Sequence, residues 1–258
     1  MAGEDAPRTG AASLQAHDNV DIALSEELFA PGCALCRHRS SQGRRYLKNL
    51  VYEGVNDVGF RRTLDQARGF CAPHTVALFE ADRDEMGGAL GTAILLESVL
   101  RHRLEELGAA DGELRRDMAR RLTQATLPAA CPVCAIENEA VGMAAARLIE
   151  WMLDDAWRDA VAASPLCLPD VLILARGATT SEERLTAARP VLLAQLARLA
   201  RLRDALADFA HDSTYDRHHR LTPEQHAAAG LATEALGGTV AWEWRHRRGH
   251  SAARRGDG

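Results

Sequence analysis

The six cysteines of this 258-residue chain occur in one pattern that is present twice. The first copy has CALC at residues 33–36 and CAPH at 71–74, and the second has CPVC at 131–134 and CLPD at 167–170. A shift of 98 residues superimposes the two CxxC pairs, and a shift of 96 superimposes the two later motifs. Because this pattern accounts for every cysteine, we predict an internal duplication of one cysteine-bearing unit.

Each copy of the pattern has the residue types of a four-ligand metal site. A CxxC pair brings two sulfurs close enough to share one tetrahedral ion, and a CxxH pair can supply the other two ligands. The motifs precede predicted helices, and a helix N-terminus favours the thiolate that a metal needs. We therefore predict that each copy closes its own site: Cys33, Cys36, Cys71 and His74 in the first, and Cys131, Cys134, Cys167 and Asp170 in the second.

The two predicted sites differ in their fourth ligand. Aspartate in the second copy replaces the imidazole of the first with a harder ligand, which could be weaker or exchangeable. Two zinc ions are the favoured cofactors, and an iron–sulfur cluster is the alternative, although the compact CxxCxxC of bacterial ferredoxins is absent. A thioredoxin-type redox pair is disfavoured because no βαβ pattern surrounds either CxxC.

The rest of the sequence indicates an all-α protein. Ala, Leu and Arg dominate, aromatic residues make up 5% of the chain, and no convincing period-2 alternation occurs. We predict two tandem homologous helical units, a C-terminal helix opened by the capping box TPEQ at 222–225, and basic residues at the end. The predicted divisions are a flexible tail at 1–18, repeats at 19–108 and 109–210, a helical extension at 211–240 and a basic tail at 241–258.

A second repeated feature lies between the cysteine motifs. The 98-residue shift places Asp57 on Asp155, and the 96-residue shift places Arg62 on Arg158. Aspartates at these points are typical of helix ends, and an Asp–Arg pairing would repeat there. The alternative is an acid–base or ligand-gripping set in a pseudo-symmetric cleft.

The motifs resemble those of a bacterial family of unknown function. CALC, RGFCAPH, CPVC and LCLPD, together with the closing segment FAHDSTYDRHHRLTPEQHAAAGLATEALGG, are similar to its repeated CPxC…GFCxxH and CPxC…FCxxH motifs. The resemblance covers residues 20–238 and implies a helical protein with paired cysteine motifs, but no established activity. Asp170 departs from the histidine usual in that family, and Ala34 replaces the usual proline.

The sequence predicts a cytoplasmic protein, because it has neither a signal peptide nor an apolar run long enough to span a membrane. We predict a metal-binding scaffold or interaction module with an unidentified protein or small-molecule partner. The alternative is a metalloenzyme or iron–sulfur sensor that reacts at Asp170. The net charge of −5 gives no bias toward nucleic acid, which only the basic tail could bind. Since the common catalytic signatures are absent, enzymatic activity stays an open question.

Overall fold

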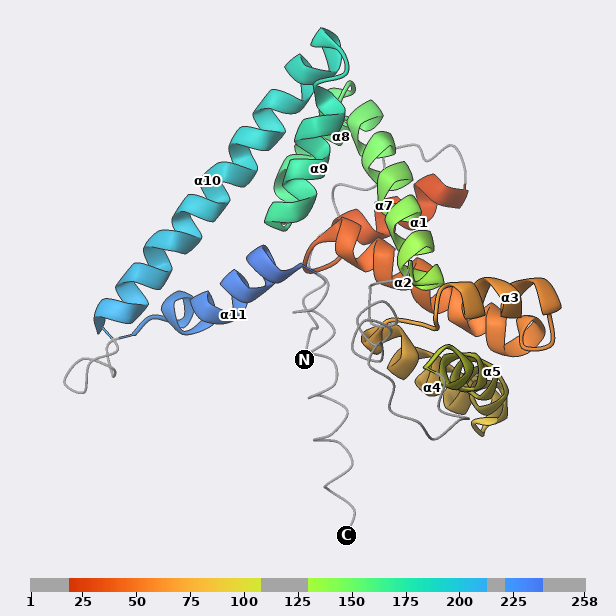
Figure 1. Cartoon of the computed structure of the whole chain (residues 1–258). Helices are drawn as coiled ribbons and strands as arrows, with labels where there is room; N and C mark the ends of the chain where they lie inside the picture. The colour runs from red at the N-terminus through yellow and green to blue at the C-terminus, as the bar shows by residue number, and fades with distance from the viewer. Residues whose placement is uncertain (1–18, 108–129, 213–220, 239–258) are drawn as a thin grey trace, which may run out of the picture. The chain divides into compact units, whose positions relative to one another are not determined.

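The computed structural model describes residues 19–107, 130–212 and 221–238, and within these ranges all regular structure is helical (Figure 1). The all-α prediction is therefore confirmed for this part of the chain. The predicted tails at 1–18 and 241–258 and the segment between the predicted repeats lie outside the described residues. The helices are α1 (Asn19–Phe29), α2 (Ala34–Asn49), which continues into the π-helical turn η2 (Leu50–Gly54), α3 (Val58–Gln66), α4 (Ala72–Met86), α5 (Leu90–Leu107), α7 (Pro132–Trp151), α8 (Asp155–Ala163), α9 (Leu168–Ala178), α10 (Glu182–Asp212) and α11 (Pro223–Gly237).

The chain forms two compact units whose boundaries differ from those of the predicted repeats. The first unit combines Met1–His38 with Val141–Gly258, and the second is Arg39–Ala140. The chain passes from one unit to the other inside α2 and again inside α7. Each unit therefore draws residues from both predicted repeats, while the duplication itself stays a prediction.

Helices α2 and α7 contribute to the hydrophobic core of both units. In the first unit, Leu35 near the start of α2 packs in one core with Leu148 near the end of α7, and both are fully buried. In the second unit the order reverses, since Leu47 near the end of α2 packs with Val133 at the start of α7. Within each unit, the two helices therefore share one hydrophobic core.

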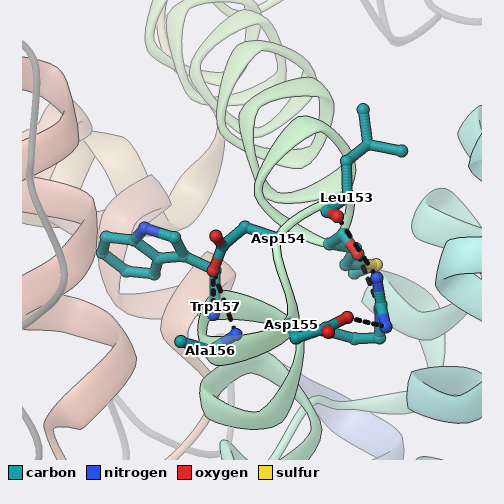
Figure 2. A network of polar contacts seen from close by, with 7 residues as sticks. Leu153, Asp154, Asp155, Ala156 and Trp157 are labelled. Carbon is teal, nitrogen blue, oxygen red and sulfur yellow. Dashed lines mark hydrogen bonds and ion pairs between the residues drawn. The ribbon is translucent and has the colours of Figure 1, made fainter.

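A short helix follows each long one, and an aspartate caps its N-terminus. The Asp57 carboxylate accepts a hydrogen bond from the Phe60 N–H at 2.7 Å, and Asp154 accepts from the N–H groups of Ala156 and Trp157 at 3.0 and 3.1 Å. Figure 2 shows this cap at the start of α8. These contacts support the helix-end interpretation of the repeated aspartates.

The predicted alignment of Asp57 with Asp155 is wrong by one residue, because Asp154 is the capping residue. Asp155 instead pairs with Arg158 at 2.6 Å (Figure 2). The offset has a local cause. Helix α2 has sixteen residues and η2 continues it for five, so that the two together are one residue longer than the twenty-residue α7. A π-helical turn accommodates one additional residue in a helix.

A further local prediction concerns the C-terminal helices. Thr222 and Gln225 form the predicted capping box at the start of α11. Helix α10 has 31 residues in all and is unbroken at Pro190. None of the described helices is long and apolar enough to cross a membrane.

Candidate metal centres

All eight predicted ligand residues gather into two groups of four. The His74 group consists of Cys71, His74, Cys131 and Cys134, and the Asp170 group consists of Cys33, Cys36, Cys167 and Asp170. In each group the four potential ligand atoms lie within 4.8 Å of one another. The His74 group lies wholly in the second compact unit, and the Asp170 group lies wholly in the first.

The predicted assignment of motifs to sites is wrong, because each CxxC pair meets the later motif of the other copy. Helix lengths explain this exchange. At 1.5 Å per residue, α2 with η2 carries the chain about 32 Å away from Cys33, whereas the nine residues of α3 can bring it back by only about 14 Å. The CAPH motif after α3 therefore stays near the end of α2. The CPVC motif at the start of α7 belongs to the same unit, where its Val133 shares a core with Leu47 near the end of α2.

The His74 group has the spacing expected of ligands to a single ion. His74 Nδ1 lies 3.1 Å from the sulfur of Cys71, 3.4 Å from that of Cys134 and 3.5 Å from that of Cys131. The sulfurs of Cys71 and Cys134 are 3.6 Å apart. Around tetrahedral zinc, the usual bond lengths separate two sulfurs by about 3.8 Å and a sulfur from a nitrogen by about 3.6 Å. The group needs little adjustment to hold one such ion.

Local helix geometry positions the ligands of the His74 group. Cys71 is the N-cap of α4, and the proline at the start of that helix suits its first turn. His74 follows within the same turn, while Cys131 directly precedes α7 and Cys134 lies in its first turn. Both motifs therefore present their sulfurs where unpaired helix N–H groups favour negative charge.

A carboxylate holds the opposite edge of the His74 ring. His74 Nε2 lies 3.3 Å from Oε1 of Glu137, and the two side chains are only 11% and 12% exposed. A proton on Nε2 donates to this carboxylate and leaves Nδ1 as the ring atom directed at the three sulfurs. Metal-binding histidines commonly have this arrangement, in which an outer carboxylate fixes the tautomer. Glu137 was not predicted, although its position three residues after Cys134 on one helix was visible in the sequence.

The Asp170 group is centred on one carboxylate oxygen. Asp170 Oδ2 lies 3.1 Å from the sulfurs of both Cys33 and Cys167 and 3.3 Å from that of Cys36. The sulfurs of Cys36 and Cys167 are 3.5 Å apart. Asp170 is fully buried, whereas Cys33 is half-buried. The aspartate is thus the least accessible member of its group.

Burial and mutual hydrogen bonding strongly shift the pKa values of the thiols and the carboxyl in the Asp170 group. Hydrogen bonds with Cys167 and Cys36 lower the pKa of Cys33 to about 2, and the hydrogen bond with Cys33 raises the pKa of Cys167. Burial, with the charge of Cys33, raises the pKa of Asp170 to about 6. The group therefore retains protons when no cation is bound, and a divalent cation binds it by displacing them.

Burial and hydrogen bonds also shift the pKa values in the His74 group. Burial raises the pKa of Cys134 to about 12. Burial also opposes ionisation of Cys131, but hydrogen bonds led by that of His74 outweigh this effect and lower its pKa to about 6. For His74, burial is likewise outweighed by the bonds to Cys131 and Glu137, which raise its pKa to about 10. A cation binding to Nδ1 would displace the proton shared between this ring and the thiols.

Helix α10 supports the loop that carries Cys167. The fully buried Gln195 accepts from the Leu166 N–H at 3.2 Å and donates to the carbonyl oxygens of Ser164 and Ala162 at 2.9 and 3.1 Å. Arg198 donates to the Leu166 carbonyl. These side chains replace the backbone hydrogen bonds that the non-helical loop lacks. No pattern in the sequence pointed to them.

The side of the Asp170 group away from its carboxylate borders a cavity of about 100 Å³. The cavity is lined by the three cysteines, by Arg198 and by residues near the end of α11. Gly238 closes that helix with a φ of 59°, and a Cβ there would lie 3.5 and 3.6 Å from the sulfurs of Cys36 and Cys167. The cysteines, and not Asp170, face the accessible side.

No family model, curated protein or solved structure matches this chain. The resemblance to a bacterial family with duplicated cysteine motifs therefore stays a prediction, and the candidate sites are interpreted from their own geometry.

Proposed function

We propose that the protein binds two zinc ions, one in each group, and serves as a metal-stabilised helical scaffold or interaction module. The spacing of the ligand atoms is the observation that carries this proposal, since four donors within 4.8 Å suit one ion. Cysteine thiolates with one histidine or one carboxylate are ligands that zinc accepts. Four protein ligands also make a closed site, which is typical of a structural rather than a catalytic ion.

The spacing supports a single ion over an iron–sulfur cluster. A cluster distributes its thiolates over different iron atoms, so its ligand sulfurs must stand farther apart than ligands that share one metal. The sulfurs of Cys71 and Cys134 at 3.6 Å, and those of Cys36 and Cys167 at 3.5 Å, leave no space for several irons between them.

Zinc would join segments that are distant in the sequence. Cys71 and Cys134 are 63 residues apart, and Cys33 and Asp170 are 137 residues apart. Structural zinc contributes on the order of 10 kcal/mol of apparent binding energy to small domains, which exceeds the net stability of many of them. Each ion would thus link a helix that begins at a CxxC pair to the helix that begins at the later motif of the other copy.

Elemental mass spectrometry on anaerobically purified protein tests this proposal. We expect colourless protein with two zinc ions per chain, and we expect chelation to lower the helical circular dichroism signal. A brown protein that contains iron and acid-labile sulfide would show that an iron–sulfur cluster is bound instead of zinc. Protein without any bound metal, and unable to take up zinc, would refute the assignment of both groups.

The alternative of a reactive centre at Asp170 has less support, because this carboxylate is fully buried and the adjoining cavity is lined by the cysteines. It would gain support if Asp170→Ala abolished a measured activity while both the fold and the His74 group stayed intact. A cytoplasmic location, the identity of a partner and nucleic-acid binding by the basic tail stay predictions from the sequence.

A further inference from the structure

The Asp170 group carries excess negative charge when it holds a divalent ion. Three cysteine thiolates and one carboxylate contribute four negative charges, so a bound zinc ion leaves two of them uncompensated. Much of this charge is removed from water, because Cys36, Cys167 and Asp170 are buried. Since charges interact more strongly in a protein interior than in water, a cation beside the group would stabilise its loaded state.

Arg198 borders the cavity on the cysteine side of this group. It lines the same space of about 100 Å³ as the three cysteines. Among the described residues that line this cavity, Arg198 is the one cation, and Glu234 of α11 is the one acidic residue. Arg198 lies on α10, in the same compact unit as the Asp170 group. The cavity therefore has a guanidinium on the accessible side of the sulfurs.

Two hydrogen bonds hold this guanidinium beside the loop that carries Cys167. Its Nη2 donates to the carbonyl oxygen of Leu166, the residue directly before Cys167, and its Nε donates to Oε1 of Gln195 at 3.3 Å. Both acceptors are neutral, and no carboxylate pairs with Arg198 in the ranges that the structure describes. The positive charge of Arg198 is therefore available to the thiolates.

The charge of Arg198 interacts with the sulfurs of the group. Burial lowers the pKa of Arg198, while the charges of Cys33 and Cys167 act in the opposite direction. A guanidinium stays protonated in proteins, so this attraction stabilises the thiolates. Arg37, which directly follows the first CxxC pair, differs because it forms an ion pair with Glu27 at 2.6 Å. Of these two arginines, Arg198 is the one whose charge is not already balanced by a carboxylate.

We propose that Arg198 supplies the positive charge that offsets the excess negative charge of the zinc-loaded Asp170 group. The aspartate ligand gives this group one more negative charge than a neutral histidine would, and the guanidinium compensates for it from the cysteine side. This inference rests on the proposed binding of zinc. It adds that the zinc affinity of this group depends on the charge of residue 198, beyond the support that Arg198 gives to the loop at Leu166.

Two substitutions of Arg198 in the full-length, zinc-loaded chain separate charge from hydrogen bonding. Arg198→Gln keeps a neutral N–H donor and removes the charge, whereas Arg198→Lys keeps the charge and loses the planar fork of donors. We expect Arg198→Gln to weaken the zinc of the Asp170 group about 10- to 100-fold, and Arg198→Lys to recover most of that loss. The matched control is Arg203→Gln, at an exposed position of the same helix, which should leave both affinities unchanged.

Chelator competition measures the affinity for each zinc, and ¹⁵N NMR of the His74 ring identifies the group that has lost its ion. The ring signals should stay unchanged while zinc leaves the Asp170 group, because His74 belongs to the other group. The helical circular dichroism signal of each variant shows whether it is folded.

A double-mutant cycle with Asp170→Asn tests the dependence on the charge of the group. Asparagine keeps an oxygen ligand of similar shape and leaves only one uncompensated negative charge in the loaded group. Asp170→Asn should weaken this zinc by itself. Because the attraction is proportional to that charge, the additional loss caused by Arg198→Gln should then fall, for example from about 10-fold to about 3-fold.

The outcomes separate this inference from the proposed function. If the unmodified chain binds no zinc, the function proposed above fails. If it binds two ions and Arg198→Gln behaves like Arg203→Gln, the role of Arg198 is refuted while zinc binding stands. Equal losses in Arg198→Lys and Arg198→Gln would reduce Arg198 to a support for the loop and refute the charge role, as would simple additivity between positions 170 and 198.

Discussion

Replacement of Gly43 by alanine separates helix propensity from metal-site geometry. Alanine in a helix interior is more favourable than glycine by about 1 kcal/mol, so propensity alone predicts that Gly43→Ala stabilises α2. The structure predicts the opposite result for the zinc-loaded protein. The new Cβ would take the space of the Glu137 carboxylate, with its Cδ and Cγ only 3.0 and 3.1 Å away.

The steric conflict itself is inexpensive, because it involves the end of a flexible side chain. The cost arises when Glu137 moves away from His74 Nε2, now 3.3 Å distant, in a nearly buried location. A hydrogen bond to a charged group contributes about 1.5 to 3 kcal/mol, which exceeds the gain in propensity. We therefore expect a loss of about 10-fold or more in zinc affinity at the His74 group, equivalent to at least about 1.4 kcal/mol.

Chelator competition and thermal unfolding, each with and without zinc, check this prediction. Gly43→Ala should weaken the zinc of the His74 group, leave the zinc of the Asp170 group unchanged and raise the stability of the metal-free chain slightly. In a Glu137→Ala background the same substitution should no longer affect zinc affinity. If Gly43→Ala alone bound zinc at the His74 group as tightly as the unmodified chain or more tightly, Glu137 would have no role in holding His74.

Two further predictions follow from contacts outside the metal groups. Asp154→Ala should lower the free energy of unfolding by about 1 kcal/mol, measured by thermal denaturation, because it removes the cap of α8; the control Asp155→Ala, at an exposed ion pair, should change it by only a few tenths of a kcal/mol. Gln195→Leu should cost about 3 kcal/mol and weaken the zinc of the Asp170 group selectively, because it leaves the Leu166 N–H and Ser164 carbonyl unpaired; equal loss of both zinc ions would argue against this local role.

The helical class and the eight candidate ligands could be predicted because both depend on local signals. Helix-favouring composition and capping residues act within a few positions, and the structure places Cys71 and Cys167 at helix N-caps as the motifs suggest. The register between Asp57 and Asp154 was missed because the second copy offers two adjacent aspartates, and the residue types do not mark the π-helical turn that lengthens the first copy. Gln195 and Glu137 were missed because their roles depend on tertiary neighbours, although the place of Glu137 beside its CxxC pair was a usable clue.

The pairing of the motifs was predicted wrongly because sequence proximity was taken to indicate spatial proximity. The observed helix lengths explain the error, since a return helix of nine residues cannot reverse an excursion of about 32 Å. The remaining information is tertiary: Leu35 shares the core of the first unit with Leu148, and Leu47 shares the core of the second unit with Val133. With the motifs exchanged in this way, each candidate metal group depends on residues from both predicted repeats.

Two triple variants with equal numbers of substitutions test the pairing in the full-length chain. Changing Cys33, Cys36 and Cys167 to serine removes three ligands from the Asp170 group and none from the His74 group. This variant should retain one tightly bound zinc with an unchanged His74 ring signal. Changing Cys33, Cys36 and Cys71 instead damages both groups, and we expect no tightly bound zinc. If each copy closed its own site, the first variant would lose both ions and the second would keep one, so the metal content of the pair decides between the two arrangements.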